Sequence, residues 1–236
     1  MTTIFAQGGP EAVIDQETQR RAVRAAIDYA EDCSRTLLLP PDATRLYSNA
    51  GALTHMFYQE LKGSAEVDIM PALGTHFAMT DEELKRMFGR SIPLDRFLVH
   101  NWRDDLVRLG EVPAAYVHQV SDDCLKESMP DFAVPVEINK RLVESGYDAI
   151  MSIGQVVPHE VIGMANGIKN VMVGAGGRET INKTHFLGAA YGMEDIMGRA
   201  ETPVRDLMNY AHERYLDELP VLFILTVMAR DESGEM

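Results

Sequence analysis

Residues 147–160 read YDAIMSIGQVVPHE, a mostly apolar run that ends in a proline and a histidine. The run Tyr147–Val157 is typical of a strand that is buried on both faces of a parallel sheet. Outward from this strand, we predict strands and helices that alternate along the chain. The other predicted strands are Thr36–Pro40, Val67–Leu73, Phe97–Trp102, Ala115–Val120 and Val221–Ala229. The predicted helices are Ser48–Gly63, Thr80–Phe88, Asn139–Gly146 and Thr202–Leu219. Thr80, as N-cap, and Glu83 are expected to form a capping box at the start of the second of these helices.

This alternation predicts an α/β domain of Rossmann-like form, with a mainly parallel sheet flanked by helices. The sequence contains no internal repeat, low-complexity tract or linker, so we expect a single domain over residues 1–236. Within it, residues 1–30 are expected to form an N-terminal extension and a helix. The polar tail Asp231–Met236 follows the last predicted strand directly, and we expect the chain to be one lobe of a longer protein.

The composition excludes several classes of protein. The 236 residues include 22 basic and 36 acidic side chains, for a net charge of -14, which argues against a protein that binds the phosphate backbone of nucleic acids. The two cysteines, Cys33 and Cys124, are too few for a disulfide scaffold. The N-terminus has no signal-peptide pattern, and the longest apolar run is too short to span a membrane. We therefore expect a soluble, cytoplasmic protein without nucleic-acid or membrane partners.

Several polar residues directly follow the predicted strands. Asp42 and Arg45 follow the first strand, His76 follows the second, and His159 follows the long buried strand, with Lys169 ten positions later. In an open parallel sheet, ligands bind outside the carboxyl ends of the strands. We therefore expect these side chains to lie at one edge of the sheet.

Taken singly, each of these residues also has an ordinary structural interpretation. Asp42 is equally well placed to cap a helix or form an Asx turn, and His76 to serve as a loop residue. His159 has a neighbouring carboxylate for an ion pair, and Lys169 is compatible with a solvated loop. The other histidines, which fall inside predicted helices or strands, are interpreted as structural: His55, His100, His118 and His212.

A glycine-rich run lies at residues 174–177, with sequence GAGG. Consecutive backbone N–H groups in such a loop can cradle a phosphate. The run lacks the spacings of the dinucleotide-binding and P-loop motifs, so by itself it is a weak signal.

Together, these residues resemble the N-terminal lobe of the lactate racemase family, the nickel-pincer-nucleotide enzymes. The matching motifs are PDATR at 41–45, GTHFAMTDEEL at 74–84, INK at 138–140 and PHEVIGMANGIKNVMVGAGGRETINKTH at 158–185. The resemblance runs in the same order over roughly residues 36–230. Members of the family carry a second, C-terminal lobe that is absent from this chain.

The resemblance implies a role for each position that matches. Lys169 corresponds to the lysine that tethers the pyridinium-derived cofactor covalently, and His185 to the histidine that ligates nickel. His76 and His159 correspond to the paired acid/base histidines. Arg45 corresponds to the arginine beside the substrate carboxylate.

The remaining correspondences concern the cofactor. Asp42 and Arg45 match a loop that helps to hold it, and Gly174, Gly176 and Gly177 match the region that grips its phosphate. The family's lysine commonly follows Gly-Gly-Arg, whereas residues 166–168 here are Asn-Gly-Ile, so one basic contact is absent.

The residue types suit the implied chemistry. Racemisation of a 2-hydroxy acid by hydride transfer needs a base on the hydroxyl for each hand of the substrate, and histidine exchanges protons near neutral pH. Imidazole suits nickel, and the guanidinium of Arg45 suits a carboxylate.

Three hypotheses follow from the sequence. The first is a racemase or epimerase of a small 2-hydroxy acid that acts with a C-terminal lobe or as a homo-oligomer. The second is a non-catalytic module that binds the nickel nucleotide or a similar ligand. The third is a hydrolase in which His76, His159 and His185 hold zinc, although their spacing matches no short zinc motif.

Overall fold

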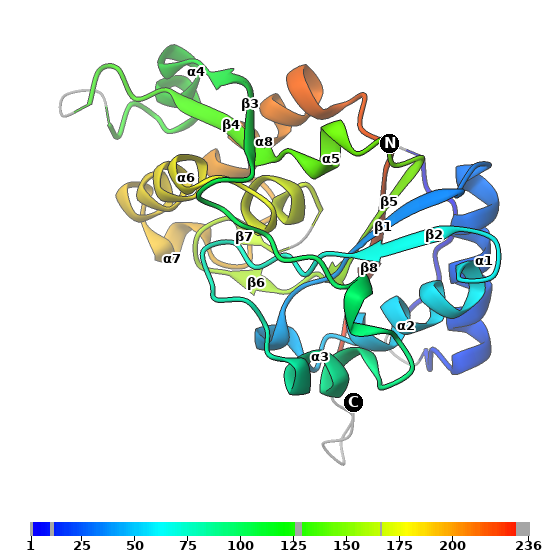
Figure 1. Cartoon of the computed structure of the whole chain (residues 1–236). Coiled ribbons are helices and arrows are strands. Elements are labelled where there is room, and N and C mark those ends of the chain that lie inside the picture. The colour runs from blue at the N-terminus through cyan, green and yellow to red at the C-terminus, as the bar shows by residue number, and fades with distance from the viewer. Residues whose placement is uncertain (1, 10–11, 126–128, 166, 230–236) are drawn as a thin grey trace.

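The computed structural model describes residues 2–9, 12–125, 129–165 and 167–229. The tail Asp231–Met236 and Asn166 lie outside the described residues. The described central sheet is entirely parallel, with the strand order β2-β1-β5-β8 (Figure 1). Its strands are β1 (Arg35–Leu39), β2 (Glu66–Ile69), β5 (Ala149–Gln155) and β8 (Val221–Thr226). The α/β fold with a mainly parallel sheet is therefore confirmed.

Helices cover both faces of this sheet (Figure 1). The α-helices are α1 (Gln16–Ala30), α2 (Ala50–Leu61), α3 (Asp81–Phe88), α4 (Ala114–Val120), α5 (Arg141–Glu144), α6 (Arg178–Tyr191), α7 (Met193–Ile196) and α8 (Pro203–Ala211). Shorter helical turns are η1 (Ala43–Arg45), η2 (Leu94–Arg96), η3 (Asn170–Gly174) and η4 (His212–Leu216). The capping box predicted at Thr80 opens α3, and Thr202 caps α8 with Pro203 at its first position.

The alternation of side chains along β1 divides the core into two parts. Leu37 and Leu39 face a core shared with α6, α8 and η3, whereas Leu38 faces a core shared with α1, α2 and α3. All three leucines are fully buried. Successive strand residues point to opposite faces, so β1 is buried on both.

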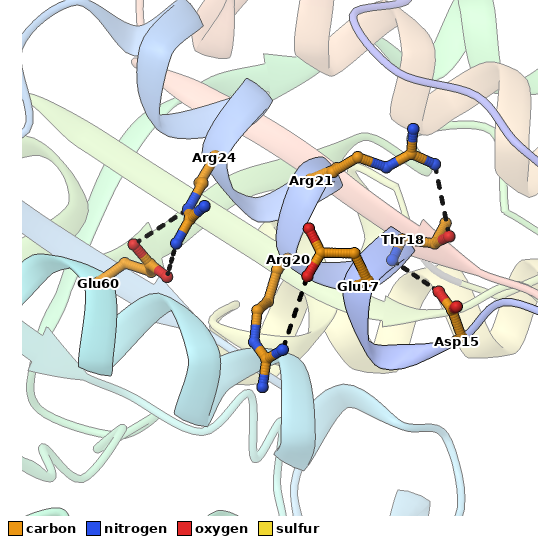
Figure 2. A network of polar contacts seen from close by, with 7 residues as sticks. All are labelled: Asp15, Glu17, Thr18, Arg20, Arg21, Arg24 and Glu60. Atoms are coloured by element: carbon orange, nitrogen blue, oxygen red, sulfur yellow. Dashed lines mark hydrogen bonds and ion pairs between the residues drawn. The ribbon is translucent and has the colours of Figure 1, made fainter.

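On one face, α1 is joined to α2 by surface polar contacts (Figure 2). Arg24 lies against Glu60, with Nη2 3.1 Å from Oε1. The Asp15 side chain caps α1 by accepting a hydrogen bond from the backbone N–H of Thr18 at 2.8 Å. The Arg24–Glu60 pair thus links α1 to α2 at the surface, while Val23 and Ala26 of α1 pack into the core beneath.

Two predicted strands are wrong. Ala115–Val120 forms α4, because Pro113 sets an extended entry and the short apolar run that follows fits a helix as well as a strand. Phe97–Trp102 makes only one bridge, between Phe97 and Ile69, and continues as a loop. The structure instead has an antiparallel pair, β3 (Leu106–Val112) and β4 (Val134–Asn139).

A further short hairpin, β6 (Pro158–His159) and β7 (Gly163–Met164), follows β5. The chain continues outward from β1 to β2 on one side and from β5 to β8 on the other. The adjacent pair β1 and β5 is thus the topological switch point, outside which a crevice is expected. No helix among the described residues is long and apolar enough to cross a membrane.

Because both faces of β1 are buried, we predict that Leu37→Ala and Leu38→Ala each lower the free energy of unfolding by about 2–5 kcal/mol. Urea denaturation measures both values. Val99→Ala is the control, because that side chain is 55% exposed and its truncation should change little. A near-zero cost for either leucine would show that one face of the sheet is not packed.

Candidate active site at the carboxyl ends of the parallel strands

A cavity of about 260 Å³ lies at the carboxyl ends of β1, β2 and β5. It is lined by the segments that follow these strands, together with η3 and α6. The residues predicted from the sequence that line it are Asp42, Arg45, His76, His159, Lys169, Gly174 and His185. Segments that are distant along the chain therefore meet at the switch point, as expected.

Asp42 and His76 form a hydrogen-bonded pair at this cavity. Nδ1 of His76 lies 2.6 Å from Oδ2 of Asp42. The other oxygen, Oδ1, accepts a hydrogen bond from the backbone N–H of Thr44 at 3.1 Å, so Asp42 also caps η1. A carboxylate only accepts hydrogen bonds, so Nδ1 of His76 carries the proton. In the neutral ring Nε2 then has a free lone pair, and His76 is arranged as a base.

His159 has the opposite arrangement. Its Nδ1 accepts a hydrogen bond from the backbone N–H of Val161 at 3.1 Å, which leaves the proton of the neutral ring on Nε2. Burial, together with the charge of Lys169, lowers the pKa of His159 to about 4. The neighbouring Glu160 opposes this shift, with Oε2 3.7 Å from Nδ1. Near pH 7, His159 is therefore neutral and presents an N–H donor.

Lys169 lies at the start of η3, where burial has a large effect on its amine. Burial, followed by the positive charge of Arg45, lowers the pKa of Lys169 to about 8. The carboxylates of Glu160 and Asp42 act in the opposite direction. The charge of Arg205, which the sequence analysis did not single out, adds a smaller lowering. A substantial fraction of Lys169 is thus uncharged and nucleophilic just above neutral pH.

His185 lies in the middle of α6 and reaches the cavity from the helix side. Its Nδ1 donates a hydrogen bond to the backbone carbonyl of Ile181 at 2.7 Å. A bond of this kind fixes the tautomer and directs the Nε2 lone pair away from the helix, as in histidines that bind metals. His185 therefore provides one imidazole donor.

The glycine run is used for packing. The N–H of Gly176 donates to the carbonyl of Val173 at 3.2 Å, and that of Gly177 donates to the carbonyl of Glu137 at 2.9 Å. Neither glycine lines the cavity, and their N–H groups are occupied, so the predicted grip on a phosphate has no support at these two positions. A Cβ on Gly176 would lie 1.8 Å from the carbonyl oxygen of Met172, so this close approach requires glycine.

His100 and Asn139 hold the same turn from the other side. His100 is buried, and its Nε2 lies 3.0 Å from the carbonyl of Gly176, while its Nδ1 lies 3.0 Å from Nδ2 of Asn139. The backbone N–H of Asn139 donates to the carbonyl of Ala175 at 2.7 Å. His100 is thus structural, as predicted, and it fixes the turn between Lys169 and His185.

The sequence analysis did not single out Asn170 as a residue of the site. Its side chain is buried, lines the cavity and donates from Nδ2 to the carbonyl of Ile153 at 3.2 Å. This bond ties the start of η3 to the carboxyl end of β5. The position of Asn170, directly after the predicted cofactor-binding residue Lys169, was the feature of the sequence that pointed to it.

Among the described residues, no three His, Cys, Asp or Glu side chains are grouped so that they could hold a metal ion. This finding counts against the zinc hypothesis for His76, His159 and His185. His185 provides one imidazole donor at this cavity.

The low pKa of Lys169 predicts a pH-dependent stability. The unfolded lysine titrates near 10.5, so between about pH 8 and 10.5 the unfolded chain binds more protons, and stability rises with pH across this window. We predict that Lys169→Met raises the free energy of unfolding at pH 7 by about 1–3 kcal/mol, with a smaller gain at pH 10. Denaturant titrations at both pH values measure the difference. Lys140→Met, which removes an exposed ion pair with Asp105, should show no such gain; equal behaviour of the two variants would contradict the prediction.

Comparisons with known proteins identify related chains. The chain is 25% identical over 209 residues to a lactate racemase from Thermoanaerobacterium thermosaccharolyticum, with 85% of this chain and 43% of that protein covered. A crystal structure of a Thermotoga maritima protein superposes with a TM-score of 0.82 at 24% identity, covering 97% of this chain and 54% of the other. The lactate racemase apoprotein from T. thermosaccharolyticum superposes with a TM-score of 0.61 at 22% identity, covering 92% and 50%. At these identities the structures establish the fold.

The family assignment comes from the sequence. The model of the lactate racemase N-terminal domain matches residues 11–128 and 117–195, which is most of the chain. The chain spans about half the length of the relatives that it matches. The chain belongs to the lactate racemase N-terminal domain family.

Proposed function

We propose that this chain is the cofactor-binding lobe of a racemase or epimerase that acts on a small 2-hydroxy acid through a covalently attached nickel-pincer nucleotide. The observation that carries the proposal is the meeting of Asp42, Arg45, His76, His159, Lys169 and His185 at one cavity. The membership of the lactate racemase N-terminal domain family supports the same function.

The side chains at the cavity fit such a cofactor. A nucleophilic amine at Lys169 is suited to the covalent attachment, and the free Nε2 of His185 is suited to nickel. The absence of a three-residue metal site among the described residues agrees with a metal whose remaining ligands belong to the cofactor. When bound, the nickel-pincer nucleotide supplies the acceptor for the hydride from the substrate.

The histidines of the chain would handle the proton of the substrate hydroxyl. His76 accepts it at Nε2, because Asp42 holds the ring with the proton on Nδ1 and stabilises the charge that develops. His159 begins as a donor at Nε2. To accept a proton there, it must carry its own proton on Nδ1, for which the carboxylate of Glu160 is the nearby partner. Arg45 would pair with the substrate carboxylate, because a guanidinium is always charged and can donate two parallel hydrogen bonds.

A non-catalytic cofactor-binding module is the second candidate. One observation bears on it: the chain spans 43% of the lactate racemase with which it aligns. Both candidate functions include binding of the cofactor. They differ in whether this chain turns over a substrate.

Loading tests the part that both candidates share. We predict that co-expression with cofactor-synthesis enzymes adds a mass at Lys169, with about one nickel per chain, as measured by intact-protein and peptide mass spectrometry with metal analysis. Lys169→Met should carry no covalent adduct. His185→Ala should keep the adduct and lose most of the nickel, because it removes an imidazole ligand.

Lys183→Met is the matched control, because Lys183 lies two residues from His185 but donates to the carbonyl of Ala133. It should load as the unchanged chain does. A folded chain that acquires neither adduct nor nickel would overturn the proposed cofactor.

Turnover separates the enzyme from the module. We predict that the loaded chain interconverts the two hands of a 2-hydroxy acid and that Asp42→Asn lowers kcat/KM by about 10²–10⁴-fold, the usual size of an acid–base contribution. For a racemase, the loss must be equal for both hands, because their equilibrium constant is one. Chiral chromatography of the products measures both directions. A loaded chain without turnover would support the binding module instead.

A further inference from the structure

The ε-amine of Lys169 is a cation without a hydrogen bond or ion pair within the described part of the chain, and it lies on the wall of the cavity. Three of the other described lysines provide a contrast. Lys140 pairs with Asp105 at 2.9 Å, Lys85 pairs with Glu82 at 3.0 Å, and Lys183 donates to a carbonyl at 2.6 Å. Lys169 therefore combines access from the cavity with an amine that the protein does not occupy.

The groups around Lys169 favour a particular reactant. Arg45 lines the same cavity and provides a permanent positive charge suited to a carboxylate. His159 presents an N–H and His76 presents a lone pair, so a proton donor and a proton acceptor both line the cavity. A volume of about 260 Å³ admits a molecule of a few carbon atoms.

We propose that the chain, before any cofactor is attached, binds small 2-oxo acids through a reversible imine at Lys169. Arg45 binds the carboxylate and the amine reacts with the adjacent carbonyl. This activity concerns the unloaded chain and does not depend on the proposed function.

The reaction balances without an oxidant or reductant. The neutral amine nitrogen of Lys169 attacks the carbonyl carbon, a C–N bond forms, and the carbonyl oxygen takes a proton to become a hydroxyl. Loss of that hydroxyl as water, with the second proton of the nitrogen, leaves the C=N bond. We assign the proton given to the oxygen to the N–H of His159 and the proton taken from the nitrogen to the lone pair of His76, because both side chains line the same cavity as Lys169. Hydrolysis reverses both steps.

The reaction needs the uncharged amine, and the environment of Lys169 supplies it. Its pKa is lowered to about 8 by burial and by Arg45. Imine formation at Lys169 should therefore rise between pH 7 and 8 and level off above the pKa.

Borohydride trapping of pyruvate tests the proposal on the full chain expressed without the cofactor-synthesis enzymes. After reduction with borohydride, peptide mass spectrometry should find the adduct at Lys169. The pyruvate concentration that gives half-maximal labelling should be lower for Lys169 than for Lys62 or Lys140. Lys169→Met should abolish the trapped product, and Lys140→Met should leave it unchanged. Labelling of Lys169 no greater than that of Lys62 would overturn the proposal.

A second variant tests the carboxylate. Arg45→Gln should raise the pyruvate concentration for half-trapping by about tenfold or more, the loss of one charge-assisted contact. Propanal, which has the carbonyl but no carboxylate, should be affected much less. Because Arg45 also lowers the pKa of Lys169, the trapping profile of the variant should move to higher pH. Equal losses for pyruvate and propanal would overturn the assignment of Arg45.

The outcome is independent of cofactor loading. Trapping of pyruvate by a chain that never acquires nickel would refute the proposed function and leave this inference standing. A chain that loads cofactor on Lys169 but traps no pyruvate when unloaded would refute this inference and leave the proposed function standing.

Discussion

The parallel pairing of β1 with β5 is the constraint on which the site depends. Their register, with Leu39 opposite Ser152, brings both carboxyl ends to the same edge of the sheet, and the chain departs from them in opposite directions (Figure 1). Asp42 and His159 follow these ends, so the sheet determines that they line one cavity. The backbone hydrogen bonds of buried strands are difficult to shift, because a slip of one residue would reverse every buried side chain. The position of the site is therefore as stable as the core.

A second level of order comes from the turn that joins η3 to α6. The carbonyl of Gly174 accepts a hydrogen bond from the N–H of Gly74, and those of Ala175 and Gly176 accept from Asn139 and His100. Each of these bonds crosses between segments that are far apart along the chain. They fix the relative positions of Lys169, before the turn, and His185, after it. A group that bound to both side chains would find their separation already set, and less conformational entropy would be lost on binding.

The sequence predicted the fold class and the edge of the sheet at which the cavity lies, because both follow from apolar periodicity and from the behaviour of parallel sheets. It also placed the capping box at Thr80, which depends on four neighbouring residues.

The sequence-based prediction failed where the outcome depends on distant contacts. Ala115–Val120 is too short for its pattern to separate a helix from a strand, and the packing of α4 against α8 settles the choice. The bond between Asp42 and His76 joins residues that are 34 positions apart, and the resemblance alone had placed Asp42 at the cofactor. At Gly177, the N–H donates to the carbonyl of Glu137, 40 positions away, a contact that the sequence pattern does not contain.

Lys169 connects the stability of the domain with its chemistry. A buried ammonium group without a hydrogen-bond partner opposes folding, and the two nearby carboxylates offset this only in part, because Arg45 and Arg205 add positive charge. The same surroundings that make the charged form costly populate the neutral amine, which is the nucleophilic form. An ion pair with Asp42 would remove the cost, but Asp42 is held by His76 and by the N–H of Thr44. Asp42 therefore acts on both groups: it accepts the hydrogen bond that orients His76, and its charge works against the low pKa of Lys169.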